Sequence, residues 1–271
     1  MNPSELRALL ERHGVRTSKA LGQHFLADAN TARRILRYAG VAPGDDVVEV
    51  GPGVGALTVA LADAGARVLA LELDRHLVPV LESVVGGRDV EIVLGDALDV
   101  EWSSLLARSS RWAMISNLPY NVATPLVVRV LEAAPMVDRM LVMVQREVGE
   151  RLAAPVGTKQ YGAVTVKVAY YAEAHVVGIV PPTVFVPRPN VESALVKLVR
   201  RAAPVRVDDP ARMFDLVRAG FATRRKTLRN ALAPALGERA TVALDAAGID
   251  PGRRAETLTL DDWAALAEAA R

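Results

Sequence analysis

Residues 49–55 read Glu-Val-Gly-Pro-Gly-Val-Gly, a stretch with three glycines in seven residues. It overlaps the end of an apolar run of strand character, Asp46–Val50, and precedes a helical pattern, Ala56–Ala64. Glycines at such a junction let a ligand approach the backbone, and the first turn of a helix presents N–H groups that have no partner inside it. The stretch therefore predicts a ligand-binding loop between a strand and a helix.

The same alternation of strand and helix patterns continues beyond this loop. Further strands are expected at residues 67–73, 90–94, 112–116, 139–144, 173–180 and 194–200. Their nearly continuous apolar and β-branched runs are typical of strands buried on both faces of a parallel sheet. The sequence thus predicts an α/β fold with a doubly wound, Rossmann-like sheet of seven strands. Residues 160–171 fit either a strand or a buried helix.

The character of the chain changes after Arg201. Residues 202–210 are typical of a linker, and helical periodicity follows at residues 213–221, 225–236, 240–247 and 261–270. We therefore expect two domains. Residues 1–203 would form the α/β domain with a basic N-terminal segment, and residues 204–271 a small all-helical domain.

Composition excludes several classes of protein. The chain has no cysteine, which rules out disulfides, thiolate zinc sites and a cysteine nucleophile. It contains no apolar run of about 18 residues, and its N-terminal residues lack the apolar core of a signal peptide. We therefore expect a cytoplasmic protein without a membrane partner.

Positive charge is concentrated in two segments, although the formal net charge is only +2. Residues 1–37 carry a balance of +4 and residues 188–235 one of +7, so the remainder of the chain is acidic. Two basic segments beside an acidic body favour a polyanionic partner. A solvated basic helix would explain the second segment equally well.

Carboxylates follow the next two expected strands. Glu72 lies 21 residues beyond Gly51 and can accept hydrogen bonds from both hydroxyls of a ribose. Asp96 follows the third strand and can accept a hydrogen bond from an adenine amino group. Glu49, at the start of the loop, can hold the loop or reach a ligand amine through water. This set of residues favours an adenosyl ligand such as S-adenosylmethionine, and a tight turn without a ligand is the alternative.

The tetrapeptide Asn117-Leu118-Pro119-Tyr120 directly follows the fourth expected strand. The exocyclic amine of adenine is a poor nucleophile because its lone pair is delocalised into the ring. The side-chain oxygen of Asn117 and the carbonyl oxygen of Leu118 could accept hydrogen bonds from its two N–H groups. These bonds would favour a pyramidal nitrogen whose lone pair is localised. Pro119 would stiffen the turn, and Tyr120 would offer a ring on which the base stacks. The alternative is a β-turn capped by Asn117.

With these motifs in this order, the chain resembles the bacterial small-subunit (16S) ribosomal RNA adenine N6,N6-dimethyltransferase family, which is linked to kasugamycin sensitivity. The resemblance runs from residue 17 to residue 271 and is carried by Leu21–Leu26, Glu49–Gly55, Asn117–Asn121, Val184–Ser193 and Phe221–Asn230. It implies S-adenosylmethionine as methyl donor, no metal, and a monomer with a role in small-subunit maturation. The implied substrate is a pair of adjacent adenosines in the 3′-terminal hairpin loop of 16S RNA, within the 30S subunit or its precursor.

The resemblance and the residue-level reasoning together assign site residues. The expected cofactor site contains His24, Leu26, Gly51, Gly53, Glu72, Asp96 and Asn117. The expected catalytic set contains Asn117, Leu118, Pro119, Tyr120 and Phe185, with Phe185 stacking on the target base opposite Tyr120. The expected phosphate contacts are Arg224, Arg225, Lys226 and Arg229, on about two turns of helix. The family usually has Asn where this chain has His24, and a packing role is the alternative for Phe185.

Three other functions fit parts of the sequence. A nicotinamide-dependent dehydrogenase fits the G-x-G-x-x-A spacing at residues 51–56 but leaves the tetrapeptide and the basic segments unexplained. An assembly factor fits the basic segments, yet a degenerate enzyme would not be expected to retain Glu72, Asp96 and the tetrapeptide. A large-subunit adenine methyltransferase of the macrolide-resistance type shares the central motifs. Residues 184–193 and 224–230 fit the small-subunit group better.

Overall fold

The computed structural model describes residues 1–15, 22–201 and 205–271, so Leu21 and part of the expected linker lie outside the described residues. The described chain forms two compact units. The first consists of Met1–Gly149 and Ala174–Arg200, and the second of Glu150–Glu173 and Arg201–Arg271.

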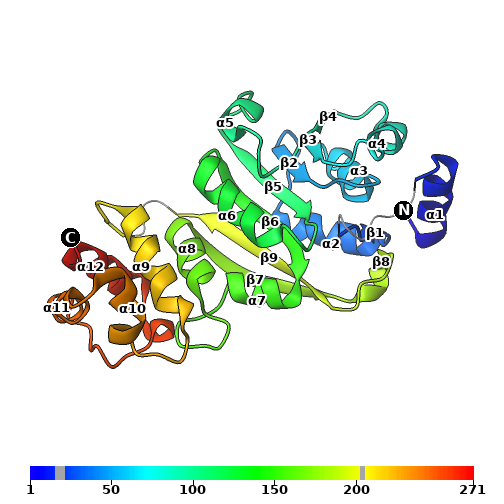
Figure 1. The fold of residues 1–271 in the computed structure, drawn as a ribbon. Coiled ribbons are helices and arrows are strands. Elements are labelled where there is room, and N and C mark those ends of the chain that lie inside the picture. The colour runs from blue at the N-terminus through cyan, green and yellow to red at the C-terminus, as the bar shows by residue number, and fades with distance from the viewer. Residues whose placement is uncertain (16–21, 202–204) are drawn as a thin grey trace. The chain divides into compact units, whose positions relative to one another are not determined.

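Seven strands form the sheet of the first unit, in the order β4-β3-β2-β5-β6-β9-β7 (Figure 1). They are β2 (Asp46–Val50), β3 (Arg67–Glu72), β4 (Val90–Leu94), β5 (Trp112–Asn117), β6 (Val137–Gln145), β7 (Ala172–Val180) and β9 (Ser193–Arg200). The strands from β4 to β6 in this order are parallel, whereas β9 is antiparallel to β6. The predicted seven-stranded sheet is confirmed. It is mixed, and residues 181–192 connect β7 to β9 without the long crossover helix that a parallel pair would need.

Helices cover both faces of this sheet. Helices α2 (Ala29–Ala39) and α3 (Ala56–Asp63) pack on one face, where Val47 of β2 belongs to their shared core. Side chains alternate along a strand, so Val48 points to the opposite face, and it is also fully buried. There α6 (Ala123–Ala133) packs against β6. The other helices that begin in this unit are α1 (Pro3–Arg12), α4 (Val78–Val85), α5 (Trp102–Leu105) and α7 (Arg146–Leu152).

The strand order reverses between β2 and β5, and the two strands diverge toward their carboxyl ends. Their register pairs Val47 with Ala113 and Val48 with Met114. Beyond these pairs, the N–H of Val50 donates to the hydroxyl of a side chain, Ser116, at 2.9 Å. Open α/β sheets bind ligands at such a switch point, beyond the carboxyl ends of the strands. The fold therefore places the glycine loop, residues 51–55, where a ligand is expected.

A second, two-stranded sheet joins two segments that are distant in the sequence. Strands β1 (Phe25–Leu26) and β8 (Phe185–Val186) are antiparallel, and β8 follows the 3₁₀ turn η1 (Pro182–Val184). The N–H of Ala27 continues the pairing by donating to the carbonyl of Val184 at 2.8 Å. Residues 22–27 are thereby fastened to the proline-rich segment that precedes β9.

The second unit is helical. It contains α8 (Ala163–Tyr171), α9 (Pro210–Ala222), α10 (Leu228–Leu236), α11 (Arg239–Ala246), the 3₁₀ turn η2 (Ala255–Thr257) and α12 (Leu260–Ala269). Residues 160–171, whose pattern fits either a strand or a buried helix, lie mostly in α8. They belong to this unit because Val166 is buried in its core and the Tyr161 hydroxyl donates to the carbonyl of Leu258 at 3.0 Å.

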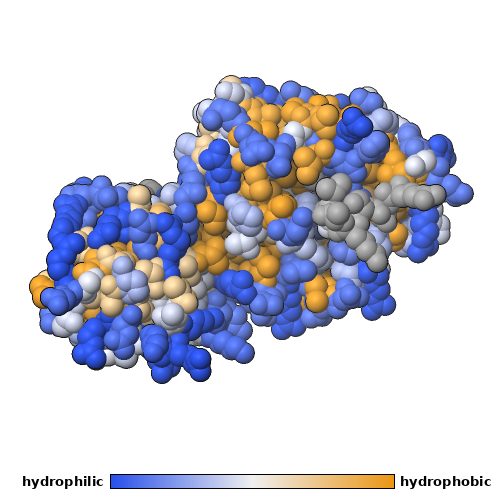
Figure 2. Space-filling model, viewed as in Figure 1, coloured by the Kyte–Doolittle hydropathy of each residue, from blue (hydrophilic) through white to orange (hydrophobic). Residues whose placement is uncertain are grey.

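Hydrophilic residues border the helical unit on the face seen in Figure 2, at the left of the view. Its buried apolar side chains form a core cluster that includes Trp263, which is fully buried. Among the residues that the structure describes, no helix is long and apolar enough to cross a membrane.

Candidate active site

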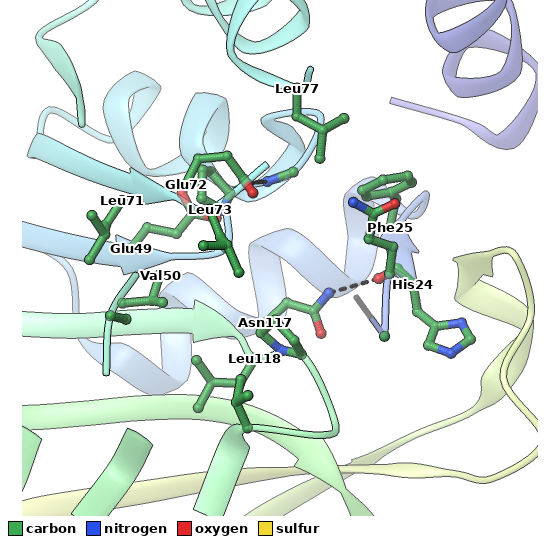
Figure 3. Close-up of a pocket in the computed structure, with 18 of the residues that line it drawn as sticks. His24, Phe25, Glu49, Val50, Leu71, Glu72, Leu73, Leu77, Asn117 and Leu118 are labelled. Carbon is green, nitrogen blue, oxygen red and sulfur yellow. Dashed lines mark hydrogen bonds between the residues drawn. The ribbon is translucent and has the colours of Figure 1, made fainter. Parts of the chain in front are cut away.

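One cavity lies at the carboxyl ends of β2, β3, β4 and β5 (Figure 3). The expected cofactor and catalytic residues line it, with the exception of Phe185: His24, Leu26, Gly51, Gly53, Glu72, Asp96, Asn117, Leu118, Pro119 and Tyr120. Most of them follow different strands, and the carboxyl ends of parallel strands meet at one edge of a sheet. This topology brings residues that are far apart in the sequence into a single site.

The glycine loop adopts backbone angles that only glycine reaches easily. Gly51, Gly53 and Gly55 have φ angles of +69°, +59° and +83°. A Cβ atom at Gly53 would lie 2.8 Å from the ring of Phe25, which closes over the loop from β1. The loop is therefore shaped by glycine both in its torsion angles and in the space that it leaves.

Glu72 ends β3 and holds the loop through its carboxylate. Its Oε2 accepts from the N–H of Gly53 at 3.0 Å, and its Oε1 accepts from the N–H of Asp74 at 2.8 Å. Burial raises the pKa of Glu72, while these two N–H groups oppose the rise. Each carboxylate oxygen has a second lone pair, so the group can also accept hydrogen bonds from two hydroxyls of one ligand.

Glu49 lies behind the loop and is only 1% exposed. Burial raises its pKa to about 8; the hydroxyl of Thr58 lowers the pKa and the nearby Glu72 raises it. Its Oε2 is buried without a hydrogen-bond partner among the described residues. A buried oxygen of this kind in a cavity wall can bond a water or a ligand donor, because buried polar atoms are rarely left unpaired.

Asp96 follows β4 and is held by the N–H of Leu98, which donates to its Oδ1 at 2.9 Å. Two leucines that the sequence motifs do not include, Leu73 and Leu77, complete this part of the cavity wall. Leu73 is 54% exposed although it directly follows a strand. An apolar residue placed after a strand-ending carboxylate is the signal that could have identified it. Apolar walls with a few polar groups are typical of sites for small molecules and cofactors.

Asn117 ends β5, and its side-chain amide has a defined orientation. Its Nδ2 donates to the carbonyl of His24 at 2.9 Å, as the dashed line in Figure 3 shows. A carbonyl can only accept a hydrogen bond, so this contact leaves Oδ1 of Asn117 as the other, accepting end of the amide. The N–H of Leu118 donates to the carbonyl of Met143 at 3.0 Å and fixes the backbone that follows.

Phe185 is not in the cavity. It is 2% exposed and belongs to the core beneath α2 and α3, and its backbone pairs with Leu26. The ring therefore offers no free face to a base in this structure, and the packing alternative describes it. The aromatic neighbour of Tyr120 at the cavity is instead His24, at 5.2 Å between ring centroids.

The four expected phosphate contacts do not lie on two turns of helix. Arg224, Arg225 and Lys226 form an exposed turn between α9 and α10, and Arg229 alone is in α10. The expected helical placement is wrong because α10 begins only after Thr227, a typical residue for a helix start. Arg224 also has a structural role, since its guanidinium donates to the carbonyls of Lys159 and Tyr161.

Comparison with known proteins identifies the family. The model of the family described as ribosomal RNA adenine dimethylase matches residues 14–271. The ribosomal RNA small subunit methyltransferase A of Streptomyces griseus subsp. griseus is 46% identical over 277 residues, which cover 99% of this chain and 94% of that protein. The protein of the same name from Moorella thermoacetica is 45% identical over 276 residues, covering 97% and 96%.

Solved structures share the fold of this chain. The 23S rRNA methyltransferase ErmE superimposes with a TM-score of 0.69 at 29% identity, covering 91% of this chain and 99% of its own. A dimethyladenosine transferase from Plasmodium falciparum gives a TM-score of 0.72 at 22% identity, covering 90% and 96%, and so shares the fold.

The cavity fits S-adenosylmethionine on its own geometry. Glu72 has lone pairs for the ribose hydroxyls, Asp96 lies beside an apolar wall suited to adenine, and the unpartnered Oε2 of Glu49 is available to a bridging water. Within residues 1–15, 22–201 and 205–271 no group of three or more His, Asp or Glu side chains is arranged to hold a metal ion. The chain belongs to the ribosomal RNA adenine dimethylase family and is an S-adenosylmethionine-dependent ribosomal RNA adenine dimethyltransferase.

Proposed function

We propose that this chain transfers methyl groups to N6 of two adjacent adenosines in the 3′-terminal hairpin loop of 16S ribosomal RNA and so contributes to small-subunit maturation. The observation that carries this choice of substrate is the 45–46% identity, over nearly the whole chain, to relatives named as small subunit methyltransferases. The 23S enzyme ErmE is only 29% identical. We further propose that the protein acts as a monomer in the cytoplasm on the 30S subunit or its precursor.

The part of the cavity lined by Glu72, Asp96 and residues 51–54, here called its cofactor half, would hold the methyl donor. S-adenosylmethionine, when bound, supplies an electrophilic methyl group on a positively charged sulfur. In our proposal Glu72 accepts from the ribose hydroxyls and Asp96 from the adenine amine, while the backbone of residues 51–55 borders the rest of the molecule. These contacts orient the donor and need no metal ligand.

The target adenine would be activated by Asn117 and Leu118. Oδ1 of Asn117 is held as an acceptor by the bond from Nδ2 to His24, and the carbonyl of Leu118 is the second acceptor. When both N–H groups of the adenine amine donate hydrogen bonds to these two acceptors, the lone pair of N6 is localised and can point toward the methyl group of the donor. The proton leaves to water after the nitrogen has become positively charged, so a strong general base is not required.

Base and backbone of the RNA would be held by separate groups. Tyr120 lines the cavity beside Asn117 and is the ring on which the flipped adenine stacks in our proposal. Arg225, Lys226 and Arg229 are exposed in and after the turn that precedes α10, where they can contact phosphates. Arg224 would contribute its charge in addition to its contacts within the helical unit.

Labelled S-adenosylmethionine and separately purified small and large ribosomal subunits test the substrate. We expect label in the RNA of the small subunit. Replacing Asn117 by Ala should lower the rate by about 10²–10³-fold, the usual cost of removing one preorganised polar group, while circular dichroism shows an intact fold. Label in large-subunit RNA would contradict the substrate, and an unchanged rate for Asn117→Ala would contradict the role of the amide.

A further inference from the structure

His24 directs its side chain away from the cofactor half of the cavity. Figure 3 shows the imidazole pointing away from Glu72 and Glu49. Its Nδ1 lies 2.8 Å from the carbonyl oxygen of Pro187, and its ring centroid lies 5.2 Å from that of Tyr120, with the planes inclined by 32°. Because a carbonyl only accepts, Nδ1 is the nitrogen that carries the proton of this hydrogen bond.

Tyr120 is held at two places by segments that are distant from it in the sequence. Its hydroxyl is hydrogen-bonded to the hydroxyl of Ser193 at 2.7 Å, and Ser193 is the fully buried first residue of β9. The second contact is the ring of His24. The hydrogen bond fixes only the hydroxyl end of Tyr120, and the imidazole adds a contact to the ring itself.

The backbone of His24 is equally well fixed. Its carbonyl accepts from Nδ2 of Asn117 at 2.9 Å, and the next residue, Phe25, pairs with Val186 of β8. Pro187, the partner of the imidazole, directly follows β8. One residue thus touches both groups that face the target base: its main chain fixes the amide of Asn117, and its side chain fixes the ring of Tyr120.

We infer that the side chain of His24 is a positioning residue for the target adenine rather than a ligand of the cofactor. Its Nδ1–H bond to Pro187 seats the imidazole, and the imidazole holds Tyr120 in the plane on which the base stacks. This inference rests on the proposed function, because it assigns the Tyr120 side of the cavity to the adenine. It assigns the cofactor contact at this position to the backbone of His24 alone.

Kinetics with paired variants test the inference. We expect His24→Ala to lower kcat/KM for small subunits by about tenfold, the upper range for an aromatic contact, and to leave the Kd for S-adenosylmethionine unchanged by calorimetry. His24→Phe keeps a ring beside Tyr120 and should recover part of the loss. His175→Ala, at an exposed histidine of the edge strand β7, is the matched control and should behave as the wild type.

A double-mutant cycle separates positioning from a general loss of structure. If His24 acts through Tyr120, adding His24→Ala to Tyr120→Ala should cost little further activity. Additive losses, or a Kd for the cofactor that rises in step with the loss of activity, would overturn the inference.

A spectroscopic measurement tests His24 independently of methyl transfer. The chain has four histidines, so ¹⁵N spectra of the imidazoles in the intact protein can be assigned with the His24→Ala variant. We expect the Nδ1–H tautomer for His24, and the Nε2–H tautomer would overturn the inference. If the wild type methylates no ribosomal subunit, the proposed function is wrong. The tautomer of His24 and the Kd for S-adenosylmethionine in His24→Ala still show whether the imidazole contacts the cofactor.

Discussion

The amide of Asn117 shows how one side chain can be both predictable and structurally defined. Its position after an apolar strand and before Leu-Pro-Tyr is readable from sequence because parallel strands expose their carboxyl ends at a ligand site. Its orientation is not readable, since it depends on the carbonyl of His24, which lies 93 positions away. Phe185 illustrates the opposite case, because a lone aromatic in a proline-rich segment gives no sign of which way its ring turns.

Glu49 should make stability depend on pH. Burial raises its pKa to about 8, whereas an unfolded chain would have the ordinary value near 4.5. Between these values the folded protein holds a proton that the unfolded protein releases, so the free energy of unfolding falls as pH rises, by at most about 1.4 kcal/mol per pH unit. Urea denaturation between pH 5 and pH 8 measures this slope.

Glu49→Gln should reduce that slope, because the amide is neutral throughout the range. Part of the slope should remain in this variant, because burial also raises the pKa of Glu72. Glu82→Gln, at an exposed carboxylate of α4, is the matched control and should retain the wild-type slope. Equal slopes for Glu49→Gln and the wild type would show that Glu49 is ionised in the folded state.

At the scale of elements, the sequence predicts the strands of the sheet but leaves one helix, α8, indistinguishable from a strand. The β-branched runs identify the strands because burial on both faces demands them. The segment at 163–171 is rich in the same residues and forms α8, since its packing partners in the helical unit, such as Met213 and Trp263, lie far along the chain. Tertiary packing overrides local propensity there, and no local pattern could reveal it.

Gly53→Ala tests the packing contact between the glycine loop and the ring of Phe25 in β1. The new methyl group would lie 2.8 Å from the ring of Phe25, so this ring, or the strand β1 that carries it, must shift. We expect a loss of about 1–2 kcal/mol of stability from the positive φ angle and, in addition, a clear loss of affinity for S-adenosylmethionine.

Gly40→Ala is the control for that variant. Gly40 has a similar φ of +64° and nothing within 4 Å of an added Cβ atom. It should lose comparable stability and keep its affinity for the cofactor. Unchanged cofactor affinity in Gly53→Ala would contradict the role assigned to the contact between Phe25 and the loop.

At the scale of the whole molecule, the net charge of +2 conceals a strong segregation of charge. Residues 188–235 carry a balance of +7, and Arg224, Arg225 and Lys226 of this range form an exposed turn before α10. The sequence could indicate a polyanionic partner from this balance. It could not show that Arg224 donates a hydrogen bond to the carbonyl of Tyr161, whereas Arg225 and Lys226 are exposed.

RNA affinity should therefore depend on salt through the exposed cations of that turn. Replacing Arg225 and Lys226 by Gln should lower the slope of log K against log salt by roughly 0.7–0.9 for each phosphate that is no longer neutralised. Replacing Arg206 and Arg239, which are exposed elsewhere in the helical unit, removes the same charge and should change the slope less. Equal effects of the two double variants would show that overall charge, and not this turn, binds the RNA.

In our proposal the Asn117 site places two methyl groups on N6 of each of two adjacent adenosines in small-subunit RNA. Nucleoside mass spectrometry of the 3′-terminal 16S fragment, after treatment of unmethylated small subunits with the protein and S-adenosylmethionine, tests it most directly. We expect N6,N6-dimethyladenosine at two neighbouring positions. Methyl groups on ring N1 or on ribose 2′-oxygens, or on 23S RNA when large subunits are present, would contradict it.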